Sequence, residues 1–173
     1  MVQSQTSGVM FTIEPMTSDR SKIIIEAVYG LGEAIVSGEV TPDLYILDKE
    51  ELRIGTKQIG KQEWQLIRNP ARDNKEVNIK VPLQPSSQTQ QKLADDDIIY
   101  LAKLGKQIEE WYQFPQDIEW AKEDKEIFIV QTRPVTTIKE AAAIKVAPEI
   151  KAPVLLSGAP ASPGTATGPV KIT

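Results

Sequence analysis

The segment QDIEWAKEDKEIFIVQTR, residues 116–133, contains two β-prone runs separated by a charged stretch. Residues 116–121 and 127–133 are rich in Ile, Val, Phe, Thr and Trp, whereas residues 122–126 are all Lys, Glu or Asp. Such a pattern predicts two antiparallel strands joined by a tight turn. The rest of the fold is therefore expected to include an antiparallel sheet that contains this hairpin.

Alternation along the two predicted strands groups their polar side chains. Asp117 and Glu119 are two residues apart, so they share one face of the first strand, and Gln131 and Arg133 share a face of the second. Pairing of Glu119 with Gln131 leaves residues 124–126 as a three-residue loop, whose left-handed position, which favours glycine, falls on a lysine. This register brings the four side chains together.

A carboxylate, an amide oxygen and a guanidinium on one surface suit a magnesium nucleotide. Mg²⁺ prefers hard oxygen ligands and completes its octahedron with water and substrate phosphates. Arg133 beside such a site can neutralise a phosphoryl group during transfer. The alternative from spacing alone is the ordinary solvated face of a half-buried sheet, because D-x-E and Q-x-R are common spacings.

Composition excludes several other chemistries. The 173 residues carry a net charge of -4 and no cluster of Lys and Arg, which argues against nucleic acid or an anionic membrane as partner. No stretch approaches the roughly 20 apolar residues of a membrane-spanning helix, so a cytoplasmic protein is expected. The chain contains neither Cys nor His, which removes thiolate catalysis, His-ligated zinc and a phosphohistidine within these residues.

Patterning predicts the remaining elements, in an α+β arrangement. A helix is expected at residues 95–112, where apolar residues recur at helical spacing after three aspartates, and a glycine-rich turn leading into a short helix is expected at residues 29–38. Residues 69–91 read as an extended connection with a short edge strand at 77–81. Further strands are predicted at residues 8–13, 22–28, 44–47, 52–58 and 64–68, the last three as a meander.

Four motifs, in order, carry a resemblance to a known family. They are SGVMFTIEP (7–15), EAVYGLGEAIVSGEVTPD (26–43), QDIEWA (116–121) and IVQTRPVT (129–136). Together they resemble the ATP-binding domain shared by phosphoenolpyruvate synthase, pyruvate phosphate dikinase and rifampicin phosphotransferase. The resemblance covers most of residues 1–137 and is strongest to the phosphoenolpyruvate synthase (pyruvate, water dikinase) branch.

The resemblance implies a fold and a set of site residues. It implies the C-terminal part of an ATP-grasp domain, a mostly antiparallel sheet with flanking helices. Positions equivalent to Glu119 and Gln131 bind Mg²⁺, and Arg133 contacts the ATP phosphates as the catalytic residue. Glu26 and Asp117 are further candidates for nucleotide binding.

The resemblance also implies a domain order and a reaction. Residues 1–137 would be a partial ATP-binding domain, residues 138–153 a linker, and residues 154–173, which include GAPASPGTATGPVKI, the truncated start of a swivelling phosphohistidine domain. The chain is thus expected to be an inactive fragment of a kinase that uses ATP and water to convert pyruvate to phosphoenolpyruvate, in the direction of gluconeogenesis. Alternatives are the ATP domain of a rifampicin-phosphotransferase-like drug kinase and a non-catalytic remnant or interaction module.

Overall fold

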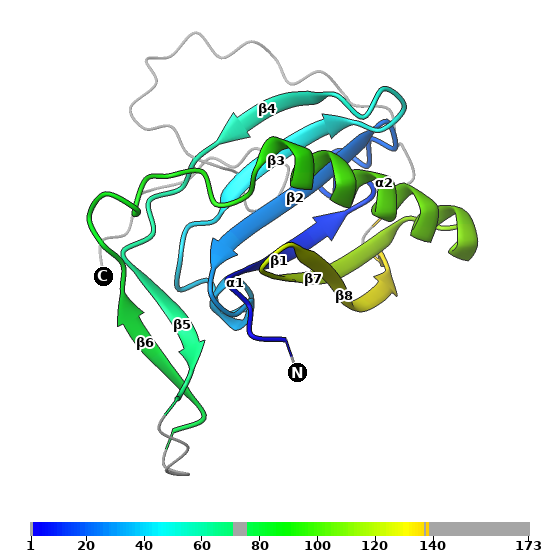
Figure 1. Cartoon of the computed structure of the whole chain (residues 1–173). Helices are drawn as coiled ribbons and strands as arrows, with labels where there is room; N and C mark the ends of the chain where they lie inside the picture. Colours follow the sequence, from blue (N-terminus) through cyan, green and yellow to red (C-terminus); the bar gives the residue numbers. More distant parts are fainter. Residues whose placement is uncertain (1, 71–75, 137, 139–173) are drawn as a thin grey trace, which may run out of the picture.

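A six-stranded antiparallel sheet forms the body of the molecule (Figure 1). The computed structural model describes residues 2–70, 76–136 and 138. Its strand order is β4-β3-β2-β1-β7-β8. The strands are β1 (Thr6–Phe11), β2 (Lys22–Tyr29), β3 (Asp43–Asp48), β4 (Ile54–Gln58), β7 (Gln116–Glu123) and β8 (Glu126–Pro134). The mostly antiparallel α+β architecture predicted from the sequence is confirmed.

The long helix α2 (Asp95–Tyr112) covers one face of this sheet (Figure 1). Alternation along the central strands points Met10, Ile25 and Ile118 into the core, where they occupy one row across β1, β2 and β7. The buried stripe of α2 packs against that row, and Gly105 lets the helix approach the Met10 side chain closely. The predicted helix boundaries are confirmed.

Gly8 has no room for a side chain. A Cβ at this position would lie 1.8 Å from the backbone oxygen of Glu26 and 2.7 Å from the indole of Trp120. Both distances are far below van der Waals contact, so only glycine allows β1 to pair with β2 while Trp120 lies over it. The glycine of the SGV motif is therefore required by packing inside the sheet.

The segment after β4 departs from the predicted meander. β5 (Trp64–Arg68) does not join the main sheet but pairs with β6 (Asn78–Pro82) in a separate two-stranded hairpin that projects from one end of the molecule (Figure 1). The prediction of a third meander strand at residues 64–68 was wrong about its partner. The hairpin also contacts the glycine turn, residues 30–32, because the Leu31 amide donates to the Leu66 oxygen at 2.8 Å.

The β7–β8 hairpin has the predicted register with a different turn. Glu119 pairs with Gln131, as expected. The loop contains two residues, Asp124 and Lys125, instead of three, and the additional residue forms a bulge at Val130. The left-handed conformation (φ 52°) falls on Asp124, which tolerates it better than lysine would. The bulge therefore compensates for the shorter turn.

Several sequence-based expectations concern residues outside the described part of the chain. The linker at 138–153 and the start of a second domain at 154–173 fall there, apart from Ile138. Among the described residues, no helix combines the length and apolar character needed to cross a bilayer.

Candidate nucleotide-binding site

The five candidate residues lie on the sheet face opposite α2. In one row across four strands stand Glu26 of β2, Val9 of β1, Glu119 of β7 and Gln131 of β8. Glu119 and Gln131 are direct cross-strand neighbours, whereas Glu26 stands two strands from Glu119, about 10 Å between Cα atoms. With Asp117 and Arg133 in the next such row, these residues form what we call the polar patch: Glu26, Asp117, Glu119, Gln131 and Arg133.

Arg133 is held in place by Asp117. Its Nε and one terminal nitrogen both lie 2.8 Å from the same oxygen of Asp117. The Asp117 side chain is largely buried, whereas the guanidinium remains well exposed. The hydrogen bond to Asp117, with smaller contributions from the charges of Asp117 and Glu119, raises the pKa of Arg133. The guanidinium is thus kept charged and pointed along the patch.

Glu26 is a half-buried carboxyl group without a hydrogen bond among the described residues. Its pKa is raised because burial disfavours the charged form. A carboxylate that burial has partly desolvated is stabilised by a bound cation, because the attraction to the cation compensates for the lost hydration.

The donor set of the patch fits a cation that brings most of its own ligands. No group of three or more Asp, Glu, His or Cys side chains close enough to enclose a metal ion occurs among the described residues. Glu119 and Gln131 offer one carboxylate and one amide oxygen side by side. Mg²⁺ commonly binds through one or two protein groups and completes its shell with water and phosphate oxygens. The residues therefore fit Mg²⁺ carried by a phosphate ligand.

An open pocket of about 720 Å³ adjoins the patch at Glu119. Its lining is mostly apolar and comes from β1, β6, β7, β8, the glycine turn and the short helix α1 (Glu33–Val36). The apolar side chains are Val2, Val9, Leu31, Val36, Val77, Trp120, Ala121, Phe128, Ile129 and Val130. The volume lies within the roughly 300–1,000 Å³ typical of small-molecule sites. An apolar pocket next to the carboxylates of the polar patch suits a ligand with an apolar end and an anionic end that carries a cation.

The glycine turn forms one side of this pocket but offers little to a phosphate. Gly30 has φ 82°, and its amide donates to the Gln5 oxygen at 2.9 Å, while its carbonyl accepts the Ser7 hydroxyl at 2.6 Å. The Leu31 amide is likewise engaged by Leu66. These two amides therefore already have backbone partners and are not free to bind a phosphate.

Sequence reasoning missed the apolar half of the site. Phe128 and Val130 belong to a run, IFIV, that reads simply as a strand, and Val77 comes from a hairpin whose partner strand was assigned elsewhere. No pattern in the sequence distinguishes these residues from ordinary strand residues. Their exposure as large apolar side chains, which marks a binding surface, is seen only in the structure.

A mostly apolar pocket with a few polar groups at its edge, here a carboxylate, an amide and an arginine, is typical of a small-molecule binding site. Comparison with known families agrees: residues 1–152 match the pyruvate phosphate dikinase, AMP/ATP-binding domain, and the chain belongs to that family.

The curated relatives are much longer enzymes. The chain is 49% identical over 177 residues to phosphoenolpyruvate synthase of Pyrococcus furiosus, which covers 99% of this chain and 22% of the relative. It is 46% identical to a probable phosphoenolpyruvate synthase of Archaeoglobus fulgidus, with the same coverages. Rifampicin phosphotransferase of Bacillus cereus is 39% identical over 144 residues, covering 80% of this chain and 15% of the relative. The chain thus spans about a fifth of the length of the relatives most similar to it.

Proposed function

We propose that this chain supplies the magnesium and phosphate side of an ATP site in a phosphoenolpyruvate synthase. The observation that carries the proposal is the cross-strand pair Glu119 and Gln131, with Arg133 two residues further along β8, next to an open apolar pocket. Family membership supports ATP as the nucleotide. The described sheet would be the C-terminal part of an ATP-grasp domain.

Each member of the polar patch has a proposed role. Glu119 and Gln131 bind Mg²⁺, which when bound neutralises phosphate charge. Arg133 contacts the phosphates and stabilises the transferring phosphoryl group. Glu26 binds the nucleotide complex from two strands away. Asp117, first considered a nucleotide ligand, is better placed to orient Arg133, since both of its short contacts go to that guanidinium.

The apolar pocket is the proposed place of the adenosine. It begins at Glu119, so a ligand whose phosphates lie on the polar patch can extend its base into the pocket. The pocket offers apolar contacts from β8 and the glycine turn, and Phe128 is the aromatic side chain on the β8 side.

The full reaction requires parts that these residues lack. We propose residues 1–137 as the ATP-binding portion, 138–153 as a linker and 154–173 as the start of a phosphohistidine domain. The enzyme would transfer a phosphoryl group from ATP to a histidine and then to pyruvate, releasing AMP and phosphate, in the cytoplasm. Because the chain contains no histidine, it cannot carry that relay itself. Purified chain given ATP, Mg²⁺ and pyruvate is therefore expected to form no phosphoenolpyruvate, and detection of that product would contradict this.

A drug kinase is the second candidate, because a rifampicin phosphotransferase is also similar to this chain. Its lower identity and shorter coverage favour the synthase. The sequence of the gene around this chain would distinguish the two, since the synthase requires a pyruvate-binding domain and the drug kinase a drug-binding module.

The proposal is tested by removing the metal-binding pair. Glu119→Ala combined with Gln131→Ala is expected to lower the affinity for Mg-ATP by more than about tenfold, because each hydrogen bond or ligand to a charged group contributes about 1.5–3 kcal/mol. Binding is measured by NMR titration of the chain, a method that detects weak association. Unchanged affinity would exclude the assignment of these two residues.

A matched control removes the same residue types from the helix-covered side. Gln107 and Glu110 are exposed on α2, and alanine at both should leave Mg-ATP binding unchanged. Omission of Mg²⁺ should weaken ATP binding to the wild-type chain and have much less effect on the Glu119→Ala, Gln131→Ala variant.

A further inference from the structure

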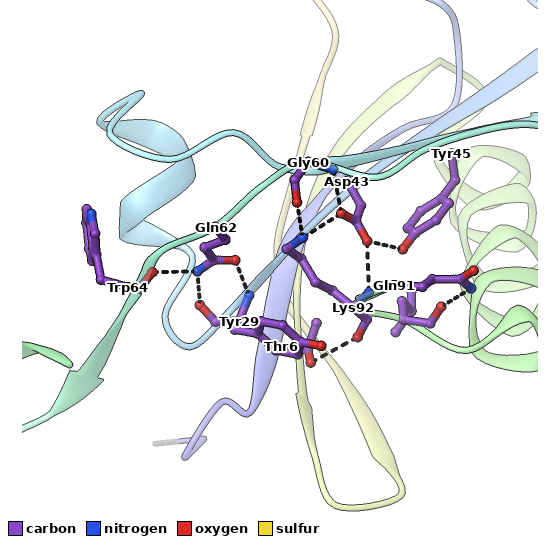
Figure 2. A network of polar contacts seen from close by, with 10 residues as sticks. Thr6, Tyr29, Asp43, Tyr45, Gly60, Gln62, Trp64, Gln91 and Lys92 are labelled. Atoms are coloured by element: carbon purple, nitrogen blue, oxygen red, sulfur yellow. Dashed lines mark hydrogen bonds and ion pairs between the residues drawn. The ribbon is translucent and has the colours of Figure 1, made fainter. Parts of the chain in front are cut away.

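Gln62 is a buried polar residue that the site description leaves unexplained. Only 1% of its surface is exposed, and it lies in the segment between β4 and β5. Its carboxamide makes three hydrogen bonds (Figure 2): Oε1 accepts from the Tyr29 amide at 2.9 Å, and Nε2 donates to the oxygens of Tyr29 and Trp64, each at 3.0 Å. Both hydrogens of the amide group are therefore used.

The hydrogen bonds of Gln62 to Tyr29 lie just beyond the point where β2 stops pairing with β3. Pairing of β3 with β2 ends at Asp43 and Ala27, two residues before Tyr29. At Tyr29 the Gln62 side chain binds both the amide and the carbonyl, as a neighbouring strand would. Tyr29 is the residue that precedes the glycine turn, so the side chain fixes the backbone from which the turn departs.

The third bond connects this point to the projecting hairpin. Trp64 begins β5, and β5 contacts the glycine turn again through Leu66. The turn contributes Leu31 and Gly32 to the apolar pocket, while the partner strand of β5 contributes Asn78. Gln62 thus stands where two sides of the pocket meet, although it does not line the pocket itself.

We infer that Gln62 is a positioning residue for the nucleoside half of the site: its carboxamide sets the glycine turn and the β5–β6 hairpin at the separation that the apolar pocket requires. The inference rests on the proposed function, since it concerns the pocket assigned to adenosine. It leaves the metal half independent, because Glu119, Gln131 and Arg133 lie on β7 and β8, which Gln62 does not contact.

The test compares two ligands that use different halves of the site. Gln62→Met keeps the length of the side chain and removes all three hydrogen bonds. NMR titration of this variant is expected to show AMP affinity reduced by about tenfold, the effect of losing partners for buried backbone groups. The affinity for magnesium pyrophosphate, which needs only the polar patch, should change by less than about twofold. The amides of Tyr29 and Leu31 should also exchange with solvent faster, while those of α2 remain protected.

Controls separate positioning from general stability. Gln58→Met, at an exposed site on β4, should leave both affinities unchanged. If Gln62→Met does not fold, Gln62→Glu, which keeps an acceptor for the Tyr29 amide, replaces it with the same expectation. Equal losses for AMP and magnesium pyrophosphate, or an unchanged AMP affinity, would overturn the inference. Wild-type chain that binds neither ligand would instead refute the proposed function, and the inference with it.

Discussion

Glu26 of the polar patch has a charge state that is coupled to folding. Its pKa is raised by burial, so the folded chain holds this proton to higher pH than the unfolded chain does. The contribution of Glu26 to stability is therefore present in acid and is lost as pH rises from the ordinary glutamate range through the raised value. Above the raised pKa, Glu26 carries a negative charge that burial disfavours.

Replacing the Glu26 carboxylate by a neutral amide should stabilise the ligand-free chain and weaken its binding of Mg-ATP. Glu26→Gln is expected to raise the melting temperature near neutral pH and to have no such effect in acid, where wild-type Glu26 is protonated. The same variant should bind Mg-ATP more weakly. Thermal unfolding at several pH values with and without Mg-ATP measures both effects.

Glu126→Gln is the control for this experiment, because Glu126 is exposed at the start of β8. It should change neither the melting temperature nor its pH dependence. A Glu26→Gln variant that melts below wild type at neutral pH would show that the carboxylate stabilises the empty fold, contrary to the burial argument.

At the scale of elements, β1 depends on Gly8 for its pairing. Gly8→Ala would place a Cβ against the backbone oxygen of Glu26, and backbone cannot move aside as a flexible side chain can. We expect a loss of about 2 kcal/mol or more in the free energy of unfolding, at the upper part of the range for overpacking. Urea unfolding measures the loss.

A second strand glycine provides the comparison. A Cβ at Gly55 of β4 would lie 3.5 Å from the Ile46 oxygen, an ordinary contact. Gly55→Ala should therefore be neutral or slightly stabilising, because alanine reduces the freedom of the unfolded chain. Equal losses at both positions would show that strand glycines matter here for a reason other than space.

Elements with local patterns could be predicted, and those with distant partners could not. The helix at Asp95–Tyr112 and the pairing of Glu119 with Gln131 follow from periodicity within short windows. The partner of β5 was assigned wrongly because its alternation fits a meander and a separate hairpin equally well. The two-residue turn was missed because no residue type in the sequence marks the compensating bulge at Val130.

At the scale of the whole molecule, a buried ion pair joins three parts of the chain. The Asp43 carboxylate at the start of β3 accepts from the Gly60 amide at 2.9 Å, from the Lys92 amide at 2.8 Å and from Lys92 Nζ at 2.6 Å (Figure 2). The Tyr45 hydroxyl adds a fourth bond, at 2.7 Å. Both charged side chains are fully buried. The main sheet, the segment leading to the β5–β6 hairpin and the segment leading to α2 therefore meet at one carboxylate.

Loss of the cation should weaken the fold as a unit. Lys92→Met leaves Asp43 buried without its counter-charge, which typically costs about 3–5 kcal/mol. Chemical unfolding should show this loss in a single transition. Adding Asp43→Asn to Lys92→Met should cost less than the sum of the two single variants, because the unpaired charge is then absent.

An exposed pair sets the scale for comparison. Lys61 contacts Glu63 at 2.6 Å, but both side chains are mostly in solvent. Lys61→Met should therefore change the free energy of unfolding by less than about 1 kcal/mol. Similar effects at Lys61 and Lys92 would contradict the importance assigned to the buried pair.

These long-range contacts mark the limit of prediction from the sequence for this molecule. Asp43 and Lys92 are 49 positions apart, and Gln62 is 33 positions from Tyr29. Single polar residues at such separations leave no periodic trace, and each is of a type usually found at the surface. The polar patch was foreseen because its members lie in adjacent strands or recognisable motifs, whereas the buried contacts of Asp43 and Gln62 arise only on folding.

The division of the sheet into a packed face and a ligand face also restricts how such a protein can change in length over evolution. Every residue in β1, β2 and β7 belongs to one face by its odd or even place, as Val9 and Met10 illustrate. Inserting one residue exchanges the faces for the remainder of the strand, burying carboxylates and exposing the core. Insertions and deletions should therefore survive within these strands only as pairs or as bulges, and drift in length should concentrate in the connections.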